Sequence, residues 1–266
     1  MALHIIGFGS HPERMASFRR SSEMFGVDVN YMMRPPLVGG GERSYEWMRI
    51  MEYVEYAKSV PEDDIILCTD TYDVIINQST ETIIDRFRAK GCDILLSGEM
   101  NCYPSEHLHK WNGIRSPTKH QYPNGGCYMG TARGLLYMFG GWKSLAETES
   151  MCKGNCDQGY LHDFYIAHHD QRSRVQVDWD CSVFQSMHLI SWNDFVIREG
   201  HISNEVMKQE PCVVHFNGGV WKTMSGMDIQ PVVLDKMEGS RNDHVVRTLA
   251  EYSQLRTTTC YPHSQV

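Results

Sequence analysis

Two carboxylates interrupt an apolar run in the stretch IILCTDTYDVII, which covers residues 65–76. Burying carboxylates such as those of Asp70 and Asp73 is costly unless they are paired, hydrogen-bonded or bound to a cation. Hard divalent cations such as Mg²⁺ and Mn²⁺ take one or two carboxylates and complete their shell with phosphate oxygens and water. The pattern therefore fits a metal site that holds a phosphorylated ligand. It also fits a turn in which Asp70 caps the backbone and Asp73 lies at the surface.

The elements around these aspartates predict an α/β fold. Short apolar strands are expected at residues 3–8, 27–33, 64–68 and 93–99, and helices at residues 13–25, 45–59 and 79–90. This alternation predicts a mostly parallel, Rossmann-like central sheet flanked by helices. Ligands of open α/β sheets bind at the carboxyl ends of the strands. Asp70 and Asp73 directly follow the third strand and are therefore well placed for a site.

The second half of the chain is less regular. Residues 100–126 are rich in Pro, His, Tyr, Asn and Gly, which indicates a long loop. Further strands are expected at residues 127–131, 175–179, 194–198 and 211–215, and helices at residues 133–145, 156–167 and 243–255. We expect a single domain over residues 1–235, followed by a C-terminal helix and tail over residues 236–266.

Composition excludes several classes of function. The net charge is −8 and there is no basic run, which argues against nucleic-acid binding. No apolar stretch is long enough to predict a membrane span, and the first residues lack the features of a signal peptide. We therefore expect a cytoplasmic protein, or one of the host-cell cytoplasm if the source is a virus. Among the nine cysteines, Cys152 and Cys156 have a spacing that fits a metal site or a disulfide.

The segment DTYDVI resembles the metal-binding segment of the glycosyltransferase domain in the procollagen lysyl hydroxylases, which has a GT-A nucleotide-diphospho-sugar transferase fold. Six further segments resemble that family in the same order. They are VGGGER (38–43), LSGEMNCYP (96–104), YPNGGCYMG (122–130), CDQ (156–158), VDWDCSVFQ (177–185) and HFNG (215–218). The order of the segments, more than any single one, supports the resemblance.

The resemblance implies a metal-dependent glycosyltransferase. Asp70, Asp73 and His215 would bind Mn²⁺ (or Mg²⁺), which grips the diphosphate of a UDP-sugar donor. A hexose or pentose would then move to a hydroxyl acceptor on a protein or glycan. Tyr72 would lie against the uracil ring, and Lys222 would be a second cation for the diphosphate. The full set of expected donor contacts is Gly39, Gly40, Thr69, Tyr72, Asn124, Gln158, Gly218 and Lys222.

Asp157 and Asp178 are the candidate catalytic carboxylates. An inverting enzyme needs a general base near the acceptor hydroxyl and a retaining enzyme does not, and the sequence fits both. Asp157 also fits the N-cap of a helix over residues 158–167. Glu99 would either orient groups near the metal or acceptor, or form a structural salt bridge.

Departures from the family pattern surround the regions expected to meet sugar and acceptor. Phe216 stands where the family has glycine, Gly219 where it has proline, and Tyr103 where it has tryptophan. The acidic run before Asp157 is missing. Two alternatives stay open: a catalytically inactive nucleotide-sugar-binding module, and a nucleotidyltransferase of similar fold. GFGSHPERM (7–15) is a poor match to the signature expected of the latter.

Overall fold

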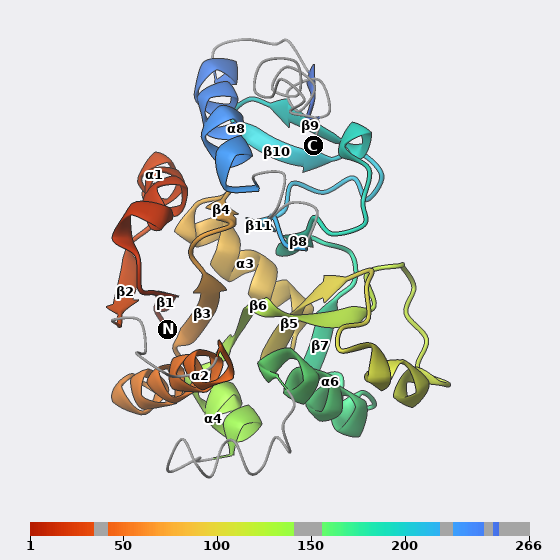
Figure 1. Cartoon of the computed structure of the whole chain (residues 1–266). Coiled ribbons are helices and arrows are strands. Elements are labelled where there is room, and N and C mark those ends of the chain that lie inside the picture. The colour runs from red at the N-terminus through yellow and green to blue at the C-terminus, as the bar shows by residue number, and fades with distance from the viewer. Residues whose placement is uncertain (35–41, 141–155, 219–225, 242–246, 250–266) are drawn as a thin grey trace, which may run out of the picture.

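The computed structural model describes residues 1–34, 42–140, 156–218, 226–241 and 247–249 (Figure 1). A six-stranded sheet forms its centre, in the order β2-β1-β3-β6-β5-β7. These strands are β1 (Leu3–Gly9), β2 (Val29–Met33), β3 (Ile65–Asp70), β5 (Ile94–Glu99), β6 (Tyr122–Thr131) and β7 (Val175–Asp178). The pairs β1/β2, β1/β3 and β5/β7 are parallel, and β6 runs antiparallel to β3 and β5. The expected mostly parallel sheet is thus confirmed.

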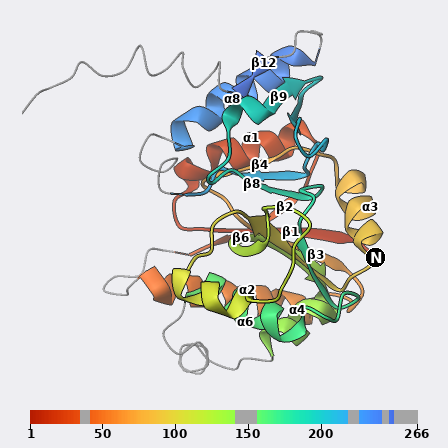
Figure 2. The same ribbon diagram turned by 90° about the vertical axis from the view of Figure 1, so that its right-hand side faces the viewer.

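Helices cover both faces of this sheet (Figure 2). One face carries α2 (Glu42–Ser59), α4 (Ala132–Phe139) and α6 (Asp157–His168), and the other carries α1 (Ala16–Met24) and α3 (Thr80–Lys90). Alternate residues of β3 serve the two faces, because side chains of a strand point to opposite sides in turn. Ile66 and Cys68 pack with α2, while Ile65 and Leu67 pack with the α1 and α3 side. A strand that is buried on both faces has a continuous apolar sequence, which is why β3 could be predicted from the sequence.

A second layer lies beyond the α1 and α3 face. Its first sheet has the order β4-β11-β8, from β4 (Val74–Ile76), β11 (Val213–His215) and β8 (Phe184–Ser186). Its second sheet has the order β10-β9-β12, from β9 (Phe195–Arg198), β10 (His201–Asn204) and β12 (Arg247–Thr248). The helix α8 (Gly226–Ser240) packs on these strands through buried residues such as Val233 and Met237. Short 3-10 helices cover Pro12–Met15, Ser105–Trp111 and Trp192–Asp194.

Strand direction brings distant segments to one edge of the central sheet. The strands β3 and β5 end at Asp70 and Glu99. Because β6 is antiparallel to both, its first residues lie beside those ends, with Asn124 opposite Ser97 and Cys127 opposite Thr69. The polar segment around Asn124 therefore meets the carboxyl ends of β3 and β5.

The structure differs from the sequence-based expectation in several places, and the short strands β4, β8 and β10 were not anticipated. The strand β6 begins at Tyr122, so the end of the expected loop over residues 100–126 is strand, and Ser105–Trp111 is a short 3-10 helix. The helix α8 was not anticipated, and the expected boundary at residue 235 falls inside it. Most of the expected helix over residues 243–255 lies outside the described residues, and the part that is described begins with the short strand β12.

Among the helices that the structure describes, none combines the length and the apolar character that crossing a membrane requires.

Candidate metal centre and the cavity beside it

Two acids and one imidazole converge at the carboxyl end of β3. Asp70 is the last residue of β3, Asp73 directly precedes β4, and His215 is the last residue of β11. Antiparallel pairing of β4 with β11 sets His215 opposite Val74, and the backbone N–H of Phe216 donates to the carbonyl of Asp73 at 2.7 Å. A ladder between strands far apart in sequence therefore brings the imidazole to the acids.

The three side chains offer a compact set of ligand atoms. One atom from each of Asp70, Asp73 and His215 lies within 4.8 Å of the others. The His215 Nε2 is 3.4 Å from Asp73 Oδ1 and 3.8 Å from Asp70 Oδ2. Burial raises the pKa of Asp70, and the Arg49 guanidinium partly offsets this. Two carboxylate oxygens and one imidazole nitrogen are a donor set that suits Mn²⁺ or another divalent cation of intermediate hardness.

Asn124 determines which nitrogen of His215 is available. Its Oδ1 accepts from the backbone N–H of Gly126 at 2.9 Å, which identifies this atom as the amide oxygen. The same Oδ1 lies 3.0 Å from His215 Nδ1, so Nδ1 must carry the proton and donate it. The other ring nitrogen, Nε2, then faces Asp70 and Asp73. Metal-binding histidines are held in this way, by a hydrogen bond from the nitrogen that does not bind the metal.

Gly126 leaves room for this arrangement. A Cβ at this position would lie 2.2 Å from His215 Cε1 and 2.8 Å from Asp70 Oδ2. Any side chain here would displace the imidazole or the carboxylate. The absence of a Cβ is therefore a steric requirement of the metal centre.

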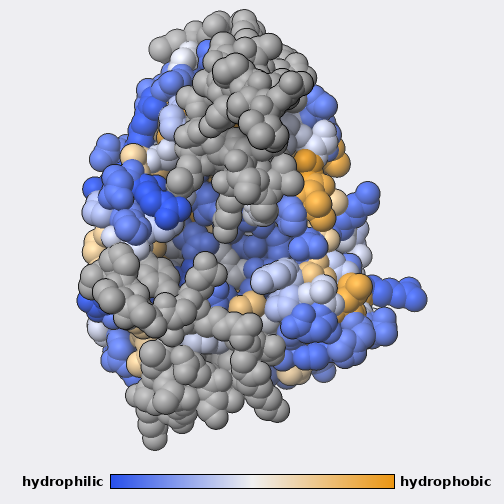
Figure 3. All heavy atoms as spheres, in the orientation of Figure 1, coloured by the Kyte–Doolittle hydropathy of each residue, from blue (hydrophilic) through white to orange (hydrophobic). Residues whose placement is uncertain are grey.

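Asp70 and His215 line a cavity of about 420 Å³, and Asp73 is not among its lining residues. Hydrophilic residues predominate across the middle of the face shown in Figure 3. The cavity wall is mostly polar and includes four acids, which are Glu46, Asp70, Glu99 and Asp157. The remaining lining residues are Arg49, Asn101, Tyr103, Asn124, Gly125, Gly126, Cys156, Gln158, His188, His215, Asn217 and Gly218. Such an excess of carboxylates suits a ligand that arrives with a divalent cation.

Glu99 is held inside the cavity by two oriented amides. Its Oε1 accepts from Gln158 Nε2 at 2.6 Å, and its Oε2 accepts from Asn217 Nδ2 at 2.7 Å. The amide oxygens of both partners accept backbone N–H groups, from Gly125 to Gln158 and from Met187 to Asn217, which fixes their NH₂ groups toward Glu99. Burial raises the pKa of Glu99 to about 7, although the amide donors and His215 favour its ionised form. The salt-bridge alternative for Glu99 is not what the structure shows.

Asp157 is the first residue of α6 and faces the same cavity. Its Oδ1 accepts from the backbone N–H of Gln158 at 2.7 Å, and its Oδ2 accepts from Arg49. The N-cap of α6 is Cys156, whose sulfur accepts from the N–H of Gly159, so the expected N-cap role of Asp157 is wrong. Asp157 thus lies at the N-terminal end of a helix and next to a guanidinium.

The predicted donor contacts fall into three groups. Asn124, Gln158 and Gly218 line the cavity. Gly218 has φ +96, and a Cβ there would lie 2.5 Å from His188, so glycine suits this position for both reasons. Thr69 is buried below the metal centre, where its hydroxyl donates to the carbonyl of Asp70. The third group, Gly39, Gly40 and Lys222, lies outside the described residues.

Tyr72 is not among the residues that line the cavity. Its hydroxyl accepts from the backbone N–H groups of Ser10 and His11, at 2.6 and 3.0 Å. The guanidinium of Arg14 stacks over its ring at 4.3 Å from the centroid. The position against a uracil ring stays a prediction.

The structure does not bring Asp178 into the cavity. This side chain is fully buried, and its Oδ2 accepts from the backbone N–H groups of Val183 and Phe184. Its Oδ1 lies 2.6 Å from Lys90 Nζ. Burial raises the pKa of Asp178 to about 6 against the opposing effect of Lys90. The expectation that Asp178 is a catalytic base is inconsistent with this placement, which is that of a structural ion pair.

From the sequence, no site role was predicted for several residues of the cavity wall, among them Glu46, Arg49, His188 and Asn217. Glu46 and Arg49 are one turn apart on α2, and each is next to a buried apolar residue, Trp47 and Ile50 respectively. Charges next to buried apolar residues were therefore the available signal. Phe216, by contrast, departs from the family pattern without touching the cavity. It is buried in the core of the second layer, where its ring contacts Trp192.

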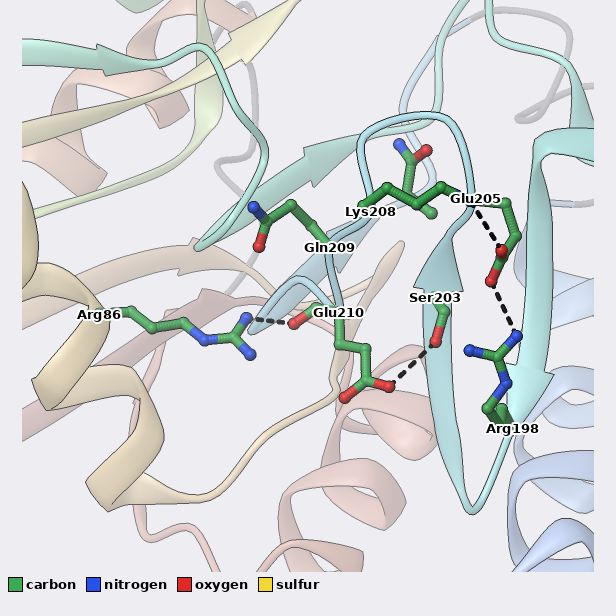
Figure 4. A pocket seen from close by; sticks show the side chains of 8 residues that line it. Arg86, Arg198, Ser203, Glu205, Lys208, Gln209 and Glu210 are labelled. Atoms are coloured by element: carbon green, nitrogen blue, oxygen red, sulfur yellow. Dashed lines mark hydrogen bonds and ion pairs between the residues drawn. The ribbon is translucent and has the colours of Figure 1, made fainter.

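A second cavity, of about 400 Å³, lies between α3 and the second layer (Figure 4). Its charged side chains bond to groups of its own wall. Arg198 donates to Glu205, Ser203 donates to Glu210, and Arg86 donates to the backbone carbonyl of Glu210. The described residues around it hold no metal-ligand cluster, since the one found in the described chain is the triad above. The first cavity is therefore the candidate site.

Known proteins resemble this chain in sequence and in fold. The family model described as PLOD GT domain matches residues 7–228. The chain is 26% identical over 206 residues to the uncharacterized protein R699 of Acanthamoeba polyphaga mimivirus, with 77% of this chain and 41% of that protein covered. It is 23% identical over 219 residues to procollagen-lysine,2-oxoglutarate 5-dioxygenase 1 of Mus musculus, with 77% of this chain and 28% of that protein covered. The chain therefore spans less than half the length of these relatives.

The chain is similar in fold to a crystal structure of a glycosyltransferase involved in the glycosylation of the major capsid of PBCV-1. The TM-score is 0.52 at 13% sequence identity, with 90% of this chain and 99% of that chain covered. At this identity the likeness concerns the fold alone, which is that of the GT-A glycosyltransferases.

Proposed function

This chain belongs to the family of the glycosyltransferase domain of the procollagen lysyl hydroxylases, and we propose that it is a metal-dependent enzyme that uses a UDP-sugar. It would move a hexose or pentose from the nucleotide to a hydroxyl group on a protein or glycan. The observation that carries this proposal is the convergence of Asp70, Asp73 and His215 on one point, with Asp70 and His215 in the wall of a polar cavity.

The donor set fits the cation that such a reaction needs. Asp70 and Asp73 offer oxygens, and His215 offers Nε2, because its Nδ1 is bonded to Asn124. A bound Mn²⁺ or Mg²⁺ would act as a Lewis acid that stabilises the charge of the departing diphosphate. The steric space left by Gly126 is part of the fit, because a Cβ there would intrude between His215 and Asp70.

The remaining polar groups of the cavity would bind the sugar and the acceptor. Each oxygen of Asp157 accepts one hydrogen bond, and a carboxylate has about four acceptor sites, so capacity remains for a sugar hydroxyl. Glu99 is oriented by Gln158 and Asn217 and would receive a hydroxyl in the same way. These contacts hold and orient the reactants, which is how much of the rate of a transfer reaction is gained.

UDP release from several UDP-sugars would test the proposal. The protein is incubated with UDP-glucose, UDP-galactose or UDP-xylose, in Mn²⁺ or in EDTA, and free UDP is measured. The proposal expects Mn²⁺-dependent release from at least one donor. Tight, metal-dependent UDP binding without release from any donor would instead identify an inactive binding module, and release of pyrophosphate from a nucleoside triphosphate would identify a nucleotidyltransferase.

A further inference from the structure

Arg49 is the one lysine or arginine among the described residues that line the cavity. It extends from α2 into a group of carboxylates, and its side chain is only 11% exposed. Burial disfavours the charge of Arg49, but Asp70 and Asp157 outweigh this effect and raise its pKa well above the ordinary value. Arg49 is therefore a permanent positive charge in a cavity whose other charged groups are acids.

The Arg49 guanidinium binds only one of the two carboxylate oxygens of Asp70. Its Nη1 donates to Asp70 Oδ1, while Oδ2 is the oxygen that lies 3.8 Å from His215 Nε2. Oδ2 is also the oxygen beside Gly126. Arg49 thus binds Asp70 Oδ1 and leaves Asp70 Oδ2 for the proposed metal.

The other arm of the guanidinium reaches Asp157. Nη2 donates to Asp157 Oδ2 and lies 3.4 Å from the carbonyl oxygen of Gly125. Asp70 ends β3 and Asp157 begins α6, and no backbone pairing joins these two elements. Arg49 is therefore a direct link between a proposed metal ligand and the carboxylate that we expect to meet the sugar.

The planar fork of arginine suits this link. Its donors point in fixed directions and can serve two carboxylates at once, whereas a lysine ammonium is a compact point charge on a flexible stem. A lysine at position 49 would keep the charge but not hold both acids in a fixed relative orientation.

We propose that Arg49 is a positioning residue. It holds the Asp157 carboxylate at a fixed position relative to the metal-bound diphosphate, so that Asp157 contacts the sugar of the donor. This inference rests on the proposed function. It predicts that Arg49 contributes to the affinity for the sugar part of the donor and not to the affinity for the nucleotide or the metal. A purely structural role would weaken all three together.

Binding measurements on Arg49→Lys test the assignment. Affinities for Mn²⁺, for UDP with Mn²⁺, and for a UDP-sugar with Mn²⁺ are measured by calorimetry. The UDP-sugar chosen must be a donor that the wild type binds more tightly than it binds UDP. We expect the affinities for Mn²⁺ and UDP to stay near those of wild type. The ratio of UDP-sugar to UDP affinity should fall about 10-fold, as expected when one oriented polar contact is lost.

A double-mutant comparison separates positioning from an independent contact. Asp157→Asn should lower the same ratio, and Arg49→Lys/Asp157→Asn should be no worse than Asp157→Asn alone, because Arg49 acts through Asp157. Arg20→Met is the matched control. Arg20 also joins two acids, Asp235 and Glu238, but far from the cavity, and its loss should leave the ratio unchanged.

Each outcome decides the inference. A ratio that is unchanged in Arg49→Lys, effects of Arg49→Lys and Asp157→Asn that add fully, or equal losses of Mn²⁺, UDP and UDP-sugar affinity would each overturn it. Arg49→Lys retains the buried charge, so its folding is expected, and its melting temperature verifies this. Turnover is measured separately. A wild-type protein that binds the UDP-sugar but never transfers it contradicts the proposed function without affecting the positioning assignment.

Discussion

The imidazole of His215 donates from Nδ1 to the side-chain oxygen of Asn124 at 3.0 Å, across 91 positions of sequence. This bond joins β11 of the second layer to β6 of the central sheet. It orients the ring and determines that Nε2 is the nitrogen presented to Asp70 and Asp73. The proposed metal centre therefore depends on a residue that is not one of its ligands.

Replacing Asn124 by alanine should weaken metal binding more than folding. Without the acceptor, His215 can turn or carry its proton on Nε2, and loss of such a partner typically lowers metal affinity about 10- to 100-fold. Calorimetry with Mn²⁺ measures the affinity and thermal melting measures the fold. Asn112→Ala, at an exposed position of the 3-10 helix end, is the control. An Asn124→Ala protein with wild-type Mn²⁺ affinity would show that the tautomer does not matter.

Asp178→Asn should affect stability and not chemistry. The change removes the charge that Lys90 faces in a buried site, and breaking a buried ion pair in this way costs about 3–5 kcal/mol. Urea denaturation measures the loss, and turnover is corrected for the folded fraction. Asp180→Asn removes the exposed partner of the same lysine and should cost much less. A stable Asp178→Asn protein with strongly reduced turnover would restore Asp178 as a catalytic candidate.

His162 should make the protein sensitive to acid. It is fully buried, its Nδ1 accepts from the Trp111 indole at 2.9 Å, and burial lowers its pKa to about 3. Because the unfolded histidine titrates near 6.5, its contribution to stability is complete above that pH and declines as the pH falls toward 3. Between pH 6.5 and about pH 5 the loss is about 2 kcal/mol.

Denaturation at these two pH values checks this effect. His162→Gln keeps an acceptor for Trp111, and its free energy of unfolding should decline less on acidification than that of wild type. His109→Gln, at an exposed position, should decline as wild type does. If His162→Gln and wild type lose the same stability between the two pH values, another group is responsible for the acid sensitivity.

Regular patterns made most of the central sheet predictable. The strand β3 is buried on both faces and the helix α3 carries a Ser79 N-cap and a Gly91 C-cap, so both are visible from local sequence. The strand β6 was placed too late, because its first half contains Pro123, Gly125 and Gly126, which have low strand propensity. Its pairing with β3 and β5 is a tertiary effect that overrides this local preference.

The candidate site was predictable only where a chemical pattern is local. Asp70 and Asp73 follow a strand, and this alone indicates a site. Nothing local joins them to His215, which needed the resemblance to a family, because the β4/β11 pairing links distant segments. Asp178 also ends a strand and gives the same signal, but Lys90 neutralises it through a contact that no spacing reveals. Arg49 was missed because a single arginine on a helix is ordinarily exposed.

The most direct measurement of the central claim is the affinity for UDP with and without Mn²⁺, in wild type and in Asp73→Asn. If Asp70, Asp73 and His215 hold a cation that binds the diphosphate, Mn²⁺ should tighten UDP binding about 10²-fold in wild type. In Asp73→Asn, with its fold intact, most of this increase should be lost. UDP binding that is equally tight in EDTA, or an undiminished effect of Mn²⁺ in Asp73→Asn, would contradict the account.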